Sequence, residues 1–130
     1  MRALAPKVKT YACEVETAAP LSASLGAGRP VAVDYAPSFV DGIGARGLLP
    51  EMWPLATSVL AGTLVVSLAE TAAAIRLLAS RARVVAEGAG AVPVAAAASG
   101  RAPGRKIVCV VSGGNIDLDR LASILGETPV

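Results

Sequence analysis

A hydroxyl, two glycines and an amide stand together near the end of the 130-residue chain, at Ser112, Gly113, Gly114 and Asn115. They come directly after the apolar run KIVCVV at 106–111. Because the glycines carry no Cβ, a flat ligand can approach the backbone there, while the hydroxyl and the amide offer hydrogen bonds. The alternative is a tight turn in which Ser112 and Asn115 satisfy only their own backbone. The pattern predicts either a ligand-binding loop or a structural turn.

Charge and composition exclude several other kinds of site. Asp117 and Asp119 follow the turn and would repel an anion, so we do not expect a phosphate-binding loop. The chain has no histidine, which excludes a Ser-His-Asp triad, a Cys-His pair and imidazole metal ligands. Its 12 basic and 10 acidic residues are interspersed, a pattern that does not favour binding to nucleic acid.

Cysteine placement and hydropathy indicate the compartment. Cys13 and Cys109 each sit inside an apolar run, as reduced and buried thiols do. No signal peptide is expected, and no uncharged apolar run reaches the roughly 18 residues that a membrane span needs. We therefore expect a cytoplasmic protein with no membrane partner.

Short apolar runs alternate with segments of helical period along the chain. Strands are predicted at 8–15, 31–35, 63–67, 83–86 and 106–111. Helices are predicted from Thr17 to Gly26 or Gly28, after a Ser67–Glu70 capping box, over 90–99 and over 117–125. Prolines and glycines break 36–62 into turns, short helices and loops. This alternation predicts an α/β fold with a mostly parallel sheet and flanking helices, in which ligands bind beyond the carboxyl ends of the strands.

Four stretches in order carry a resemblance to a known family. They are YACEVETAAP, FVDGIG, VVAEGAGAVPVAAAASG and KIVCVVSGGNIDLDRL. Together they resemble the C-terminal part of the threonine and serine dehydratases, which include serine racemase and are fold-type II pyridoxal-phosphate enzymes. The resemblance implies that residues 1–130 are the C-terminal part of a catalytic domain, an incomplete portion of that family's large domain.

The resemblance also assigns roles to five residues. Ser112 matches the residue that hydrogen-bonds the pyridine nitrogen of pyridoxal 5'-phosphate, and Gly113 and Asn115 belong to the same turn. Glu87 matches a residue beside the cofactor ring, and Gly42 a glycine whose backbone lines the ring pocket. The alternatives are that Glu87 is a helix N-terminal carboxylate favoured by the helix dipole and that Gly42 is a turn glycine.

Some relatives bind a divalent cation close to the first of these stretches. Glu14 matches the first carboxylate of that site, and the carbonyl of Ala18 a second ligand. Pro20 stands where a further carboxylate is needed, and losing a charged oxygen ligand weakens the binding of a hard cation. We do not predict a metal.

Two motifs of the family are absent from the sequence. The family forms its Schiff base with a lysine in an S-x-K-x-R-G-like motif and holds the phosphate with a run of glycines. The chain has only Lys7, Lys9 and Lys106, none in such a context. Without that lysine we expect the isolated chain to be inactive. It would need a complementary N-terminal polypeptide, or it would self-associate through an open sheet edge.

The resemblance implies a lyase that converts L-threonine or L-serine to a 2-oxo acid and ammonia. An amino-acid racemase on the same scaffold is the alternative among enzymes, because the residues that decide the reaction lie mostly outside the matched stretches. A non-catalytic interaction module is the alternative from a different class. No effector-binding regulatory domain is expected.

Overall fold

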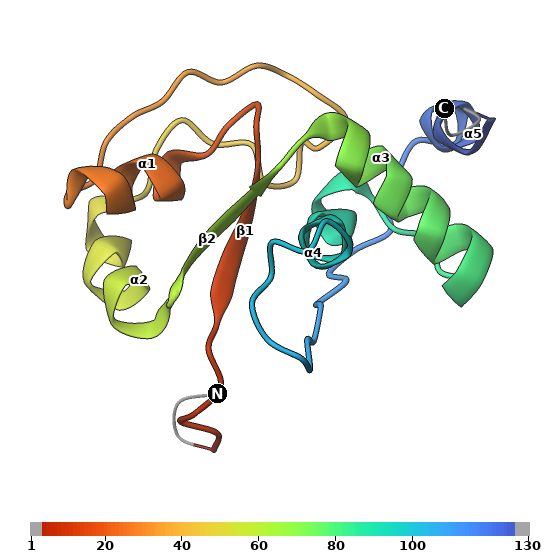
Figure 1. Ribbon diagram of the computed structural model, residues 1–130. Helices are drawn as coiled ribbons and strands as arrows, with labels where there is room; N and C mark the ends of the chain where they lie inside the picture. The colour runs from red at the N-terminus through yellow and green to blue at the C-terminus, as the bar shows by residue number, and fades with distance from the viewer. Residues whose placement is uncertain (1–3, 127–130) are drawn as a thin grey trace.

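The computed structural model describes residues 4–126 and contains a parallel pair of strands at its centre (Figure 1). Strand β1 (Tyr11–Val15) pairs with β2 (Gly62–Val66), with Tyr11 opposite Gly62 and Val15 opposite Val66. Helices flank this pair, so the predicted α/β class is confirmed. Parallel strands need a long crossover between them, and residues 16–61 supply it.

Helices form in each region where one was predicted, but among the described residues the predicted strand–helix alternation holds only as far as the helix after β2. In chain order they are α1 (Pro20–Ala27), the 3-10 turn η1 (Pro50–Met52), α2 (Trp53–Val59), α3 (Leu68–Leu77), its π-helical extension η2 (Leu78–Ala82), α4 (Gly88–Ala98) and α5 (Leu118–Gly126). The prediction that 36–62 is broken into loops and short helices is confirmed. None of the helices in residues 4–126 is long and apolar enough to cross a membrane.

The first helix begins later than predicted, at Pro20 instead of Thr17. A bridge between Val15 and Ala18 keeps residues 16–19 in a turn, and proline suits the first helical turn because its missing N–H would be unpaired there. The helix ends as predicted at Gly28, whose φ of 68° is the left-handed conformation that glycine adopts without strain.

Three predicted strands are wrong: 31–35, 83–86 and 106–111 form no ladder among the described residues. The first of them is held in a loop, where the backbone N–H of Val33 bonds to the carbonyl of Arg46. The run 106–111 was expected to be covered on both faces, yet Val108 is 91% and Val110 69% exposed. β-branched residues make a segment extended, but pairing needs a neighbour, and the described part of the chain places none beside this one.

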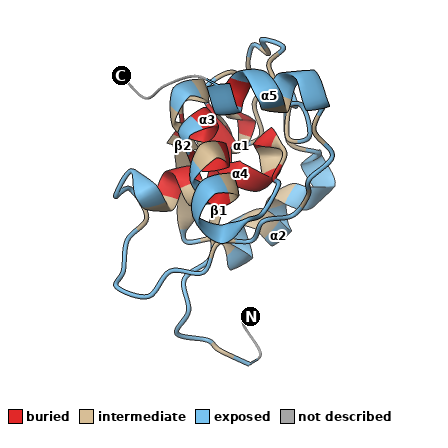
Figure 2. Ribbon diagram, turned by 90° about the vertical axis from the view of Figure 1, so that its right-hand side faces the viewer, coloured by how far each residue is buried: buried red, intermediate tan, exposed pale blue. Residues whose placement is uncertain are grey.

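The core lies where α4 packs on the sheet and α3 packs on α4, as the buried residues in Figure 2 show. Its fully buried side chains include Val15, Val66, Ile75 and Val92. Alanines fill much of the remainder, so the two helices approach each other closely. Each alanine buries less apolar area than a leucine would, which limits the hydrophobic stabilisation per residue.

Close backbone contacts fix the first turn of α4 in place. A Cβ added to Gly88 would lie 2.6 Å from the carbonyl oxygen of Phe39, and one added to Gly90 would lie 2.7 Å from the carbonyl oxygen of Gly113. Both obstacles are backbone atoms, which cannot rotate away as a side chain can. The 39–42 loop and the turn that begins at Ser112 therefore rest directly on this helix.

The predicted capping box at the start of α3 is confirmed. Ser67 Oγ accepts the backbone N–H of Glu70, and Glu70 Oε2 accepts the N–H of Ser67 at 2.7 Å. Glu70 also forms an ion pair with Arg101, which follows α4. The cap thus joins the start of α3 to the loop that leads to 106–111.

These contacts make stability depend on pH through Glu70. The hydrogen bond from the Ser67 N–H and then the Arg101 guanidinium hold the pKa of Glu70 below its ordinary value. A lowered folded-state pKa means that the carboxylate stabilises the fold above its unfolded pKa and loses this effect as the pH falls through the folded value. We expect Glu70→Gln to unfold with a smaller free energy than wild type at neutral pH and to converge with it in acid. Urea unfolding over a pH series measures this, and a difference that is constant with pH would contradict it.

The backbone contacts of the glycines in α4 lead to a second prediction about stability. In Gly90→Ala the added methyl group must push the carbonyl of Gly113 away, so we expect a loss of about 1–3 kcal/mol in the free energy of unfolding. Gly26→Ala in α1 is the matched control, because nothing lies within 4 Å of its added Cβ. Its better helix propensity should raise stability by up to about 1 kcal/mol. Equal effects in denaturant unfolding would rule out the backbone contact as the cause.

Candidate functional site

Glu87 is the point at which the predicted site residues meet. It occupies the N-cap position of α4, and its backbone N–H donates to the carbonyl of Gly113 at 3.1 Å. A Cβ on Gly113 would overlap the Glu87 carboxyl group, so this glycine leaves room for the carboxylate. Glu87 is therefore a helix N-terminal residue, as one interpretation predicted, and also lies against the Ser-Gly-Gly-Asn turn.

Gly42 lies against the opposite side of the same helix start. A Cβ on this glycine would lie 3.0 Å from the Cβ of Ala89, the second residue of α4. The loop that carries it is anchored by Val40, which is almost fully buried. Residues 42, 87 and 113 are far apart in sequence, and the first turn of α4 brings them into one neighbourhood.

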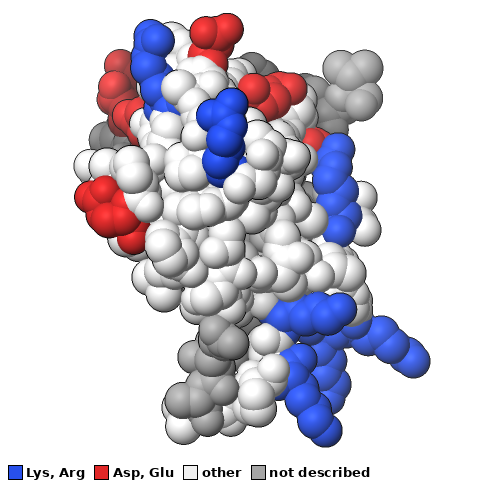
Figure 3. Space-filling view, turned by 90° about the vertical axis from the view of Figure 1, so that its left-hand side faces the viewer, with Lys and Arg blue, Asp and Glu red and all other residues white. Residues whose placement is uncertain are grey.

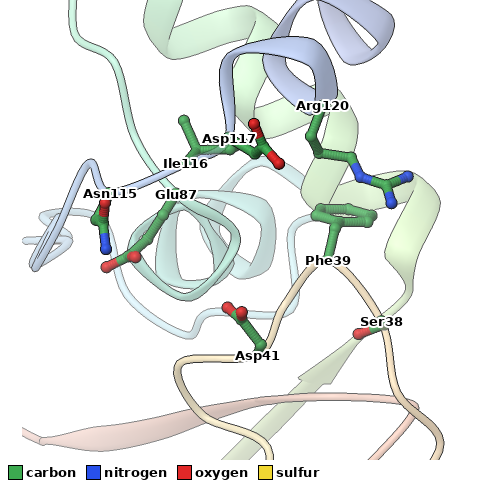
Figure 4. Close-up of a pocket in the computed structure, with 8 residues that line it drawn as sticks. All are labelled: Ser38, Phe39, Asp41, Glu87, Asn115, Ile116, Asp117 and Arg120. Carbon is green, nitrogen blue, oxygen red and sulfur yellow. The ribbon is translucent and has the colours of Figure 1, made fainter.

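A pocket of about 220 Å³ opens beside Glu87 (Figure 4). It is lined by Ser38, Phe39, Asp41, Glu87, Asn115, Ile116, Asp117 and Arg120. In Figure 4 the side chains of Glu87 and Asn115 lie at one end of the pocket, and those of Phe39 and Arg120 lie at the other. The lining is mostly polar and combines three carboxylates with one guanidinium.

The predicted residues take different places around this pocket. Glu87 and Asn115 line it directly, and Gly113 lies against Glu87, whereas Gly42 lies against Ala89, which is not among the lining residues. Ser112 is exposed and is not among the lining residues. Its backbone nitrogen lies 3.5 Å from the Cβ position of Gly90, which places it at the start of α4 beside the pocket.

Sequence reasoning missed several lining residues. Asp41 precedes Gly42 in the FVDGIG stretch, so its place in that stretch was a signal that it belongs to the site. Arg120 has a weaker signal: it lies three residues after Asp117, and this spacing puts both residues on one face of a helical turn. Phe39 opens the same FVDGIG stretch and shares the signal of Asp41, whereas Ser38 lies just before it and had none; their loop reaches the pocket by packing on Gly88.

Glu14 and Ala18 lie apart from this pocket. Glu14 accepts backbone N–H groups from Leu21 and Ser22, both at 2.8 Å, so its two oxygens serve the start of α1. Burial raises the pKa of Glu14, and these two hydrogen bonds oppose the rise. Within residues 4–126, no group of three or more acidic, cysteine or histidine side chains is placed to hold a metal ion.

The two thiols are free and only partly buried. Burial raises the pKa of Cys13, and the neighbouring Cys109 adds to the rise; burial also raises the pKa of Cys109. The Cys109 thiol donates to the carbonyl of Pro93 in α4 at 3.4 Å. A raised pKa keeps a thiol protonated and weakly nucleophilic, so neither cysteine is prepared for covalent chemistry.

The residues around the start of α4 bring a carboxylate and an amide to one end of the pocket. Gly42 and Gly113 lack the side chains that would fill the space beside Glu87 and Ala89, while Glu87 and Asn115 present a carboxylate and an amide. Neither a lysine nor a cysteine is found among the lining residues. The arrangement can bind and orient a ligand, but its lining side chains supply no amine for a covalent bond.

Comparison with known proteins assigns the chain to a family. Residues 1–113 match the family model described as pyridoxal-phosphate dependent enzyme. The chain is 34% identical over 128 residues to an L-threonine ammonia-lyase of Thermotoga maritima, covering 98% of this chain and 32% of that protein. It is 37% identical over 115 residues to an L-threonine ammonia-lyase of Geobacter sulfurreducens, covering 85% and 29%.

Solved structures agree with this assignment. Threonine deaminase isoform 2 of Solanum lycopersicum superposes with a TM-score of 0.84 at 26% identity, covering 95% of this chain and 37% of that one. Maize serine racemase superposes with a TM-score of 0.83 at 26% identity, covering 94% and 40%. The chain spans about a third of the length of the curated relatives it matches. By its sequence match and its fold, the chain belongs to the pyridoxal-phosphate dependent enzyme family.

Proposed function

We propose that this chain forms part of a pyridoxal-phosphate dependent ammonia-lyase that converts L-threonine or L-serine to a 2-oxo acid and ammonia. The observation that carries the proposal is the meeting of Glu87, Gly113 and Asn115 at the start of α4. The similarity to L-threonine ammonia-lyases over most of this chain supports the choice of reaction. Residues 1–130 would be the C-terminal part of the catalytic domain, and the protein would be cytoplasmic.

Each proposed site residue has a distinct task. The Ser112 hydroxyl would donate a hydrogen bond to the pyridine nitrogen, and a neutral donor leaves that nitrogen largely unprotonated. Glu87 and Asn115 would orient the ring, and Gly42 and Gly113 would let the backbone approach it closely. When bound, pyridoxal phosphate withdraws electrons from the substrate and so eases removal of its α-proton.

The amine that holds the cofactor must come from outside this pocket. None of Lys7, Lys9 and Lys106 is among the residues that line it. The isolated chain would therefore be inactive, and a complementary N-terminal polypeptide would supply the lysine and the phosphate-binding glycines. Such a division explains why the residues present can bind and orient but not react.

Two other functions have specific support. Maize serine racemase has the same fold over 94% of this chain, which supports an amino-acid racemase. The exposed apolar run at 106–111 supports an interaction module that never binds the cofactor. The residues described here do not favour a lyase over a racemase, since both reactions begin with removal of the α-proton.

A chimera tests the proposed function. The part of the Thermotoga L-threonine ammonia-lyase that matches this chain is replaced by residues 1–130, and the product is assayed with L-threonine and L-serine. We expect ammonia and the 2-oxo acid from the chimera, and none from the isolated chain. In the chimera, Ser112→Ala should lower kcat/KM roughly 10- to 100-fold, the effect of losing the hydrogen bond that Ser112 would make to the pyridine nitrogen.

A spectroscopic readout separates a binding role from a structural one. Ser112→Ala should also shift the absorbance of the bound cofactor, because the hydroxyl acts on the ring itself. Ser123→Ala, at an exposed position of α5, is the matched control and should change neither quantity. Formation of D-serine without a 2-oxo acid would favour the racemase. A folded chimera that binds no cofactor would favour the interaction module.

A further inference from the structure

Helix α5 is attached to the rest of the described chain by few side chains. It packs chiefly on α3, beside which it lies in Figure 1. Within residues 4–126 its contacts with the hydrophobic core come from the buried Ile124 and the partly buried Leu121. Burial of apolar surface is not directional, so these two side chains hold the helix against the core without fixing its exact position. A directional contact is needed to fix it.

Arg76 supplies such a contact. It stands in the last turn of α3, and its Nη1 donates a hydrogen bond to the carbonyl oxygen of Ile124 at 3.0 Å. Ile124 lies in the last turn of α5, where the carbonyls have no partner within the helix. A guanidinium at this place pairs with the carbonyl and is favoured by the negative end of the helix dipole. Arg76 therefore fixes the C-terminal end of α5 on α3.

The surroundings of Arg76 strengthen this hydrogen bond. On the face shown in Figure 3, several Lys and Arg side chains project outward into solvent, where charge interactions are worth little. Arg76 is instead partly buried. A hydrogen bond from an ionised donor is stronger than a neutral one, and more so where water is partly excluded.

The chain that leads into α5 is also held at the start of α4. The carbonyl of Gly113 accepts the N–H of Glu87 at 3.1 Å. The chain between Gly113 and Ile124 therefore has an anchor at each end. Four residues that line the pocket lie between the two anchors: Asn115, Ile116, Asp117 and Arg120. A shift of α5 on α3 would move these residues relative to Glu87, which caps α4.

We propose that Arg76 is a positioning residue of the candidate site. It is not among the lining residues, so it acts through α5, whose position determines that of the preceding turn. The effect on the site rests on the proposed function, because Ser112 in that turn is the residue proposed to contact the cofactor ring. The hold on α5 itself needs no cofactor and can be measured on the isolated chain.

Amide hydrogen exchange of the isolated chain tests the hold on α5. Arg76→Met keeps an unbranched apolar side chain and removes the donor, so we expect exchange over 118–126 to quicken roughly tenfold or more, while exchange in β1 is unchanged. Arg81→Met in η2 is the matched control, because Arg81 is exposed and its loss should leave both rates at their wild-type values.

A second variant keeps this test decisive. Arg76→Lys retains the charge but not the planar guanidinium, so we expect a smaller increase in exchange over 118–126. If circular dichroism shows that Arg76→Met does not fold, the comparison of Arg76→Lys with wild type decides the test. Wild-type exchange over 118–126 in the folded variants would overturn the proposal. An equal increase in β1 would also overturn it, because that result indicates a general loss of stability.

The chimera with the Thermotoga enzyme tests the effect on the site. Arg76→Met should lower kcat/KM about 3- to 10-fold and shift the absorbance of the bound cofactor in the same direction as Ser112→Ala. Because both changes act through the Ser112 hydroxyl, the double variant should have a kcat/KM within about twofold of that of Ser112→Ala alone. Arg76→Lys should recover part of the loss. Multiplication of the two separate effects in the double variant would overturn the positioning role.

Failure of this proposal differs from failure of the proposed function. A chimera that retains Arg76 and Ser112 but yields no product would overturn the proposed function, and exchange in the isolated chain would still decide whether Arg76 holds α5. An active chimera in which Arg76→Met leaves both kcat/KM and the cofactor absorbance unchanged would overturn the role of Arg76 at the site.

Discussion

The close approach of two backbone segments to the first turn of α4 is the constraint on which the rest of the structure depends. Gly88 lies against the carbonyl of Phe39, and Gly90 lies against the carbonyl of Gly113. Alanine at either position would push these segments away. These segments carry the lining residues Asp41 and Asn115, so the shape of the pocket depends on glycine at positions 88 and 90.

Small side chains also determine how the core packs. Alanines on α3 and α4 let α3 pack closely on α4, which in turn packs on β1 and β2. Val108 and Val110 lie outside this core and are exposed in the described part of the chain.

The chain offers one part of a chemical site. Its pocket combines carboxylates, an amide and a guanidinium, and none of the lining side chains is an amine or a thiol. The chain belongs to the pyridoxal-phosphate dependent enzyme family and spans about a third of the length of the relatives it matches. On the proposed function, residues of this chain hold and orient the cofactor ring, and a lysine outside the pocket holds it covalently.

Local chemistry in the sequence was enough to determine the capping box at Ser67 and that α1 ends at a glycine, Gly26 or Gly28. These features depend on residues within one helical turn of each other, so a single chain segment contains the information. The resemblance identified the stretches that meet at Glu87, because their residue types and order are visible in the sequence. Only the tertiary structure decided that 106–111 forms no ladder within residues 4–126, that Ser112 is exposed while Glu87 and Asn115 line a pocket, and that Arg120 joins them. The pairing and burial of a segment, and the shape of a pocket, depend on which distant segments pack against it. The residue types within one segment do not specify these neighbours.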